Sequence, residues 1–200
     1  FSCTESDNPV DDQDDNNNKT QEISKEEAQE AFNYLNDIRQ NPSAYSEEIG
    51  SFMSNIDPIR KLIWSDILAE VARNRALDMA KREYVAHVDP DGVGPNVKIH
   101  NAGYELRAEW IDEKDENNFE SIGAGYKDGK ATIKALIIDE NVPSKNHRNH
   151  LLGLKDFWKQ CDDIGIGFVY SEGTKFRSYC CILIAMHDFS KIVEIPVEIE

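Results

Sequence analysis

The hydrophobic pattern of this chain changes from a helical period in its first half to a strand pattern near its end. In the first half, apolar residues recur three and four positions apart, as on one face of an amphipathic helix. These residues are Ala28, Ala31, Phe32, Leu35 and Ile38, and then Leu68, Val71, Ala72, Ala76, Met79 and Ala80. Two later apolar runs, residues 164–170 and 177–186, flank the turn-forming residues 171–175, which is typical of a β-hairpin. Helices followed by strands favour an α+β domain.

Local signals mark the boundaries of the expected elements. Ser24 and Glu27 form a capping box that opens the first helix, and Asn41 and Pro42 close it. The other expected elements are a helix over residues 44–53, a longer helix from Ser65 to Tyr84, loops over residues 87–94 and 101–118, a helix over residues 130–139 and a terminal strand over residues 191–199.

The charge balance excludes two classes of partner. The 200 residues include 38 acidic and 22 basic side chains, which gives a formal net charge of -16. Nucleic acids and anionic lipid surfaces are bound through clusters of Lys and Arg, so we expect no nucleic-acid partner and no basic membrane patch. The longest apolar run, residues 180–186, is too short to span a bilayer.

The N-terminal segment is set apart by its acidity. Residues 1–23 hold seven acidic side chains and one basic one, and residues 11–21 contain no apolar side chain. Such a segment buries too little surface to fold, so residues 1–23 are predicted to be a disordered tether. The sequence Phe1-Ser2-Cys3 resembles the end of a bacterial lipobox, which predicts lipidation of Cys3 and membrane attachment through that residue only. An unpaired surface cysteine is the alternative.

Three further cysteines are Cys161, Cys180 and Cys181. An odd number leaves at least one free or paired between chains, and adjacent residues of a strand face opposite sides. Buried apolar thiols are the expected state, although a bridge from Cys161 to one of the adjacent pair stays open at this stage. Because the chain has no CxxC pair, a cysteine zinc site is not expected.

Six blocks of sequence, in order, resemble the CAP family, also called the SCP-like extracellular domain. They are FNYLNDIRQNPSAY (32–45), LIWSDILAEVARNRALDMA (62–80), HVDPDG (87–92), FESIGAG (119–125), IIDENVPSKNHRNHLLG (137–153) and DDIGIGF (162–168). The resemblance implies a three-layer α-β-α sandwich with a central antiparallel sheet over residues 24–190, followed by a strand or tail over residues 191–200. It also implies an extracellular, cell-surface or periplasmic location. Separately, we expect a monomer.

The resemblance also implies a cleft lined by two histidines and two acidic residues. Carried over motif by motif, these are His87, Glu120, His147 and Glu140, with Asp139 as the alternative to Glu140. Two departures from the family pattern are Phe119-Glu120-Ser121 in place of Gly-Glu-Asn, and Asn146-His147-Arg148 in place of Gly-His-Arg. The disulfide-linked motifs and cysteine-rich extensions of animal members are missing, so channel-directed activity is not carried over.

Imidazoles and carboxylates are ligands that zinc accepts, so the four cleft residues could hold Zn or another divalent cation. The alternative is a hydrogen-bonded His–Glu cluster without a metal, in which the carboxylates orient the imidazoles. Outside the cleft, His150 is expected at the surface, and His100 and His187 in structural or exposed positions. Asp89 and Asp91 predict a capped turn rather than a calcium loop, because their spacing is too short.

No Ser or Cys lies in a recognisable nucleophile motif, and no catalytic residue is assigned. We therefore expect a secreted or surface-anchored binding module rather than an enzyme, with a small lipid, a metal or a protein as ligand. The resemblance names sterols, fatty acids and divalent metals as ligand classes, and the residues do not choose among them. A metal-dependent hydrolase that uses the His/Glu tetrad is one alternative, and a structural or adhesive surface module is another.

Overall fold

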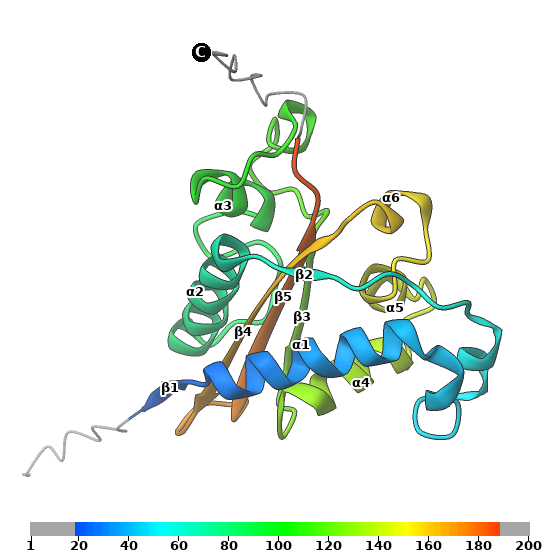
Figure 1. Ribbon diagram of the computed structural model, residues 1–200. Helices are drawn as coiled ribbons and strands as arrows, with labels where there is room; N and C mark the ends of the chain where they lie inside the picture. The colour runs from blue at the N-terminus through cyan, green and yellow to red at the C-terminus, as the bar shows by residue number, and fades with distance from the viewer. Residues whose placement is uncertain (1–18, 189–200) are drawn as a thin grey trace, which may run out of the picture.

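A computed structural model describes residues 19–188, and it shows a central sheet between two layers of helices (Figure 1). The strands are β1 (Gln21–Ile23), β2 (Ile63–Trp64), β3 (Glu120–Ala124), β4 (Asp163–Ser171) and β5 (Ser178–Ala185). The helices are α1 (Lys25–Gln40), α2 (Asp66–Arg82), α3 (Pro95–Asn101), α4 (Gly129–Ile138), α5 (Asn146–Leu151) and α6 (Asp156–Lys159). The expected α+β sandwich is confirmed.

The sheet has the order β1-β4-β5-β3, and all of these neighbours are antiparallel. The short strand β2 also pairs with β4, in parallel. Helix α2 packs on one face of β4 and β5, while α1, α4 and α5 cover the other face. The strand β3 therefore lies at one edge of the sheet, between the α2 layer and the α4–α5 layer.

Glycines in β4 allow α2 to pack closely on the sheet. A Cβ atom at Gly165 would lie 2.1 Å from the backbone N of Ala69, and one at Gly167 would lie 2.3 Å from the N of Arg73. Both distances are far shorter than van der Waals contact, so the backbone of α2 occupies the space that side chains would need. The alternating Ile and Gly residues of the strand thus place apolar side chains toward α1 and bare backbone toward α2.

The predicted helix starts are confirmed by their caps. Ser24 Oγ accepts a hydrogen bond from the N–H of Glu27, and Ser65 Oγ accepts one from the N–H of Leu68. Helix α4 starts one residue earlier than expected, where the Asp128 carboxylate accepts from the N–H of Ala131. Residues 87–94 lie in the expected loop.

Several short elements differ from the sequence expectations. Residues 44–53 do not form one helix, but fall in two 3₁₀ turns, Pro42–Tyr45 and Ser51–Asn55. The strands β1, β2 and β3 and the helices α3, α5 and α6 span two to seven residues. Elements of this length show too few positions for a hydrophobic period to be recognised. The Ala108–Trp110 turn interrupts the expected loop over residues 101–118.

The boundary of the acidic tether is also corrected. Residues 21–23 pair with Ser171, Tyr170 and Val169 of β4, so the folded domain begins before residue 24. Backbone pairing along β4 orders this stretch, although it offers few apolar side chains. Cys3, the other tether residues up to 18 and the terminal strand expected over residues 191–199 lie outside the described residues, and those expectations stay predictions.

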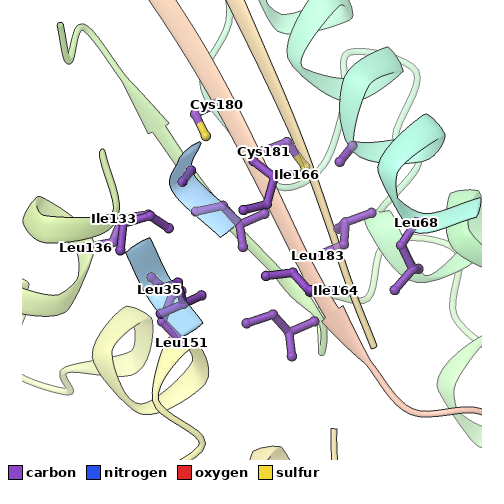
Figure 2. Close-up of a cluster of buried hydrophobic side chains, with 14 of the residues drawn as sticks. Leu35, Leu68, Ile133, Leu136, Leu151, Ile164, Ile166, Cys180, Cys181 and Leu183 are labelled. Carbon is purple, nitrogen blue, oxygen red and sulfur yellow. The ribbon is translucent and has the colours of Figure 1, made fainter. Parts of the chain in front are cut away.

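The hydrophobic core fills both faces of the sheet. Figure 2 shows Leu35, Ile133, Leu136 and Leu151 gathered on the α1–α4 side and Leu68 on the α2 side. Cys161, Cys180 and Cys181 are all buried and free, which confirms the expectation of buried thiols. Burial raises the pKa of Cys161 and of Cys180 to about 12, so these thiols are protonated at neutral pH. None of the helices within residues 19–188 combines the length and the hydropathy that a membrane span requires.

Candidate functional site

The first half of the site joins three segments through one buried carboxylate. Glu120 is the first residue of β3, Arg75 projects from the middle of α2, and His87 lies in the loop after that helix. Arg75 Nε donates to Glu120 Oε2 at 2.9 Å and Arg75 Nη2 to Oε1 at 3.1 Å, while His87 Nδ1 lies 3.0 Å from Oε1. The side chain of Glu120 is fully buried and that of His87 is 38% exposed.

Arg75 also holds the loop that carries His87. Its Nη2 atom donates to the backbone carbonyls of Ala86 and His87, each at 2.9 Å. Its Nη1 atom donates to the Tyr84 hydroxyl at 2.6 Å. One guanidinium therefore fixes both the carboxylate and the backbone of the histidine that faces it, which is the positional specificity that a forked donor provides.

The charge state of Glu120 follows from its partners. Burial raises the pKa of this carboxyl, but the hydrogen bonds from His87 and Arg75 and the charge of Arg75 outweigh burial and lower the pKa below its usual value. Cys181 Sγ, buried behind the pair, lies 3.3 Å from Glu120 Oε2. Glu120 is therefore ionised at neutral pH. It accepts hydrogen bonds and carries no proton that it could transfer to a ligand.

The second half of the site is a local turn. Asp139 follows α4 in the left-handed conformation, with φ of 52°. Its Oδ1 atom lies 2.8 Å from His147 Nδ1, and its Oδ2 atom accepts from the backbone N–H groups of His147 at 3.1 Å and Arg148 at 3.3 Å. The side chain of Asp139 is 2% exposed and that of His147 is 27% exposed. This pair repeats the first: a buried carboxylate fixes Nδ1 of a partly exposed imidazole.

The acid beside His147 is thus Asp139 and not Glu140, which corrects the register of the sequence assignment. Asp139 turns inward because it ends α4, whereas Glu140 is exposed at the next position of the turn. Within residues 19–188, Glu140 forms no hydrogen bond or ion pair. His87 contacts Glu120 and His147 contacts Asp139, so these residues form two histidine–carboxylate pairs.

The sequence predicts His150 at the surface, but the structure places it in the interior. It is 3% exposed, with Nδ1 2.7 Å from Ser121 Oγ and Nε2 3.3 Å from the carbonyl oxygen of Ile184. Burial lowers the pKa of His150 to about 4, although the hydrogen bond to the Ile184 carbonyl opposes this shift. Helix α5 has only six residues, too few for a period from which the inward face could be predicted.

The remaining polar candidates have structural roles. Asp89 Oδ1 accepts from the N–H groups of Asp91 and Val93, which confirms the predicted turn, and Lys98 binds the same carboxylate. Although burial raises the pKa of Asp89, these contacts outweigh it and hold the pKa down at about 2. His187 stacks on Tyr104 with ring centres 3.9 Å apart, and His100 lies on α3.

A pocket of about 530 Å³ opens beside the second pair, and among the described residues its lining includes Asp139, Glu140 and His147 but not His87 or Glu120. It runs along the outer side of β3, between Val85, two residues before His87, and the turn that holds Asp139 and His147. Its walls are mostly apolar. They comprise Val85, Ile122, Gly123, Ala124, Tyr126, Ala135, Leu136, Ile138, Asp139, Glu140, Asn141, Val142, His147 and Phe176.

The four-ligand metal site considered from the sequence does not fit this geometry. Over residues 19–188, no group of three or more His, Cys, Asp or Glu side chains is placed to hold a metal ion. Zinc sites in proteins use three or four such ligands, whereas Glu120 and Asp139 are here bound to Nδ1 atoms and to other donors. Their position matches that of carboxylates that orient an imidazole, and neither is free to activate a water molecule.

Comparisons with known sequences and structures identify the proteins that this chain is similar to. A sequence model of CAP, the cysteine-rich secretory protein family, matches residues 32–183. An outer surface protein from Borrelia burgdorferi has a similar structure, with a TM-score of 0.57 and 17% identity over 84% of this chain and 98% of that chain. An extracellular protein containing a SCP domain, from Bacillus anthracis str. Ames, gives a TM-score of 0.49 and 17% identity over 80% of this chain and 41% of that chain. A search of curated protein sequences gives no significant match.

Proposed function

The chain belongs to the CAP, or cysteine-rich secretory protein, family, and on that basis we propose that it is an extracellular or surface-located binding module whose ligand contacts His87 and His147. The geometry shared by the two pairs carries the proposal. Each buried carboxylate fixes Nδ1 and leaves Nε2 on the opposite edge of a partly exposed ring. Neither Nε2 atom has a partner within residues 19–188.

The hydrogen bonds define what the imidazoles recognise. A neutral ring that donates Nδ1–H to a carboxylate has an acceptor at Nε2. In the neutral form, the two rings offer acceptors to a ligand that carries N–H or O–H donors. Recognition is favoured over catalysis because Glu120 and Asp139 are occupied by their partners and the nearby thiol of Cys181 is buried with its pKa raised well above the usual value.

The location has separate support. The structural neighbour from Borrelia burgdorferi is an outer surface protein, and a surface location for this chain agrees with it. Lipidation of Cys3 is the finer form of this proposal. A Cys3→Ser variant expressed from the full-length gene should move from the detergent phase to the aqueous phase, whereas equal partition of both forms, without an acyl mass on the wild type, would contradict the lipid anchor.

The binding proposal is tested by nuclear magnetic resonance on the histidine side chains. The ¹⁵N spectra should show that Nδ1 is protonated in both His87 and His147, since Nδ1 of each ring faces a carboxylate. A mixed library of peptides, fatty acids and sugars should contain ligands that shift the ring signals of both residues together. The ligand should be recovered unchanged by mass spectrometry, because no turnover is expected.

His87→Ala and His147→Ala should each weaken the binding of that ligand at least tenfold, which corresponds to about 1.4 kcal/mol. The matched control is His100→Ala, a histidine on α3 outside the pocket. A library in which no compound shifts either ring would contradict the proposal and favour a structural or adhesive module. Conversion of a ligand to a new mass would favour the hydrolase alternative.

A further inference from the structure

The two edges of the sheet differ in whether they are covered. At one edge β4 is paired by β1 and β2, and the N–H groups of Ser24 and Ser65 close the ends of these pairings on Phe168 and Ile164. At the other edge β3 pairs only with β5 among the described strands. We propose that the outer edge of β3 binds an extended basic peptide segment of another protein as an added strand. This inference rests on the proposed function, since the edge lies in the same pocket, and it names the ligand class.

The direction of each backbone group on β3 follows from the register. The carbonyl of Phe119 accepts from the N–H of Ile184, and the N–H of Gly125 donates to the carbonyl of Ser178. Hydrogen-bonded pairs alternate along an antiparallel ladder, so residues 121 and 123 also face β5. The N–H and C=O groups of residues 120, 122 and 124 therefore point away from the sheet.

Of these three residues, Glu120 already has a partner for its outward backbone groups, and this partner shows which groups the edge can bind. The side-chain amide of Asn117 donates to the carbonyl of Glu120 at 3.1 Å and accepts from its N–H at 2.9 Å. One residue of an added strand would supply the same two groups, an N–H donor and a C=O acceptor. Ile122 and Ala124 each keep one outward donor and one outward acceptor, and within residues 19–188 these groups have no hydrogen-bond partner.

Apolar side chains flank the open edge on both sides. Val85 is 41% exposed and Tyr126 is 36% exposed, and both line the pocket together with Phe176. Side chains of a bound strand alternate between two faces, so one set would contact Val85 and the other the Tyr126 side of the pocket. Binding would cover apolar surface and unpaired backbone groups at the same time, and an exposed edge of this kind is otherwise a site of aggregation.

The net charge of the chain indicates which kind of segment binds the open edge of β3. A second copy of this chain carries the same net charge of -16, and residues 189–200 contain three acidic side chains against one lysine. Glu140, exposed at the rim of the pocket, has no ion pair within residues 19–188. The exposed carboxylate of Glu140 and the net negative charge of the chain favour a ligand with cationic N–H donors. A basic partner peptide is therefore preferred over a second copy or the chain's own C-terminal segment.

The test uses the full-length protein and a positional library of acetylated, amidated octapeptides, read by fluorescence polarisation. The best binders should carry Lys or Arg next to apolar residues. Methylating single backbone nitrogens of the best peptide should weaken binding at least tenfold at every second position and less than twofold between them. This period of two distinguishes strand addition from side-chain recognition, because the methyl group removes only a backbone donor.

Protein variants give the matching half of the experiment. Ala124→Pro removes an outward N–H without removing a ladder bond to β5, and it should bind at least fivefold more weakly than Ala124→Val, which keeps that N–H. Glu140→Lys should weaken binding of the basic peptide at least fivefold at low salt, whereas Glu113→Lys, exposed and outside the pocket, should not. If Ala124→Pro fails to fold, the methylation series on the wild type still decides.

Each other outcome overturns the proposal. Methylation effects without a period of two would mean that the edge is not used. Dimers that disappear in Ala124→Pro would assign the edge to a second copy, and peptide binding that requires deletion of residues 189–200 would assign it to the chain's own segment. Lipids or sugars that shift the rings of His87 and His147 while no peptide does would refute this inference and leave the proposed function in place. Failure of every library compound to shift the rings would refute the proposed function as well.

Discussion

The two histidine–carboxylate pairs fix their imidazoles in the same way but are assembled differently. Glu120 is bound by Arg75 and His87, which lie 45 and 33 positions away in the sequence. Asp139 and His147 are eight positions apart and belong to one turn. The first pair exists only once the α2 layer has packed against β3, whereas the second is a property of the turn between α4 and α5.

The partners of the two carboxylates differ in charge as well as in distance. Glu120 neutralises Arg75, whose side chain is 2% exposed, so neither group can turn to water if the other is lost. Asp139 is bound mainly by backbone N–H groups and one imidazole, which lie closer to the surface. The comparison therefore predicts that the first carboxylate contributes far more to stability than the second, although both orient a histidine.

The largest effect should come from Glu120→Ala. This change leaves the buried guanidinium of Arg75 without its counter-charge, which costs about 3–5 kcal/mol in comparable pairs. Urea unfolding at neutral pH should show this loss in the free energy of unfolding. The double variant Arg75→Met with Glu120→Leu removes both charges and should recover most of it. A loss below about 1 kcal/mol in the single variant would show that the pair is not buried as described.

The fold was predictable to the extent that its elements were long. Helices α1, α2 and α4 were recognised from their periods and caps, and the β4–β5 hairpin from its apolar runs and turn residues. Strand β3 was not predicted, because its residues ESIGA fit contacts on both faces of the strand. Glu120 contacts Arg75 and Ser121 contacts His150. A Cβ at Gly123 would lie 2.7 Å from Thr132 Cγ2. The intrinsic β-propensity of these residues does not reflect such long-range contacts.

The candidate site was predictable in its residue types but not in its register. The resemblance supplied His87, Glu120 and His147, and it left Asp139 and Glu140 as neighbours to choose between. The choice depends on where α4 ends and on the left-handed φ of residue 139, which the sequence does not reveal. Arg75 was missed altogether, because a single arginine in an amphipathic helix is usually read as part of its solvent-exposed face.

The next effect concerns pH and the buried histidine His150. Because burial lowers the pKa of His150 from 6.5 to about 4, the unfolded state binds a proton that the folded state rejects. Stability from this neutral histidine is complete above about pH 6.5 and should fall by roughly 3 kcal/mol as the pH drops toward 4. Urea unfolding at several pH values should show this slope.

A His150→Phe variant serves as the reference for the pH series. It has no titrating ring at this position, so its stability should change less than that of the wild type between pH 6.5 and 4.5. Glu120 does not disturb this window. Its lowered pKa means that the stability it contributes is present above about pH 4.3 and is lost only as the pH falls further. Equal slopes for both proteins would show that His150 is charged in the folded state.

A smaller effect is expected at the local pair. Asp139→Ala removes the acceptor of two backbone N–H groups at the start of α5 and places a residue with a poor left-handed propensity at φ of 52°. Loss of a comparable cap costs about 1–2 kcal/mol. Asp139→Asn keeps an acceptor and tolerates the left-handed conformation, so it should cost less than Asp139→Ala. A cost for Asp139→Ala that matches Glu120→Ala would erase the distinction between a local and a long-range pair.

The smallest effect should come from Glu140→Gln, and it tests the register of the site directly. Glu140 is exposed and has no hydrogen-bond or ion-pair partner within residues 19–188, so its charge should contribute no more than about 0.5 kcal/mol to the free energy of unfolding. The ¹⁵N ring signals of His147 should stay those of the wild type in Glu140→Gln and should change in Asp139→Asn, because only Asp139 contacts Nδ1. If Glu140→Gln instead changed the tautomer of His147, the carboxylate of the second pair would be Glu140, and the contrast between a capped turn and a buried ion pair would no longer hold.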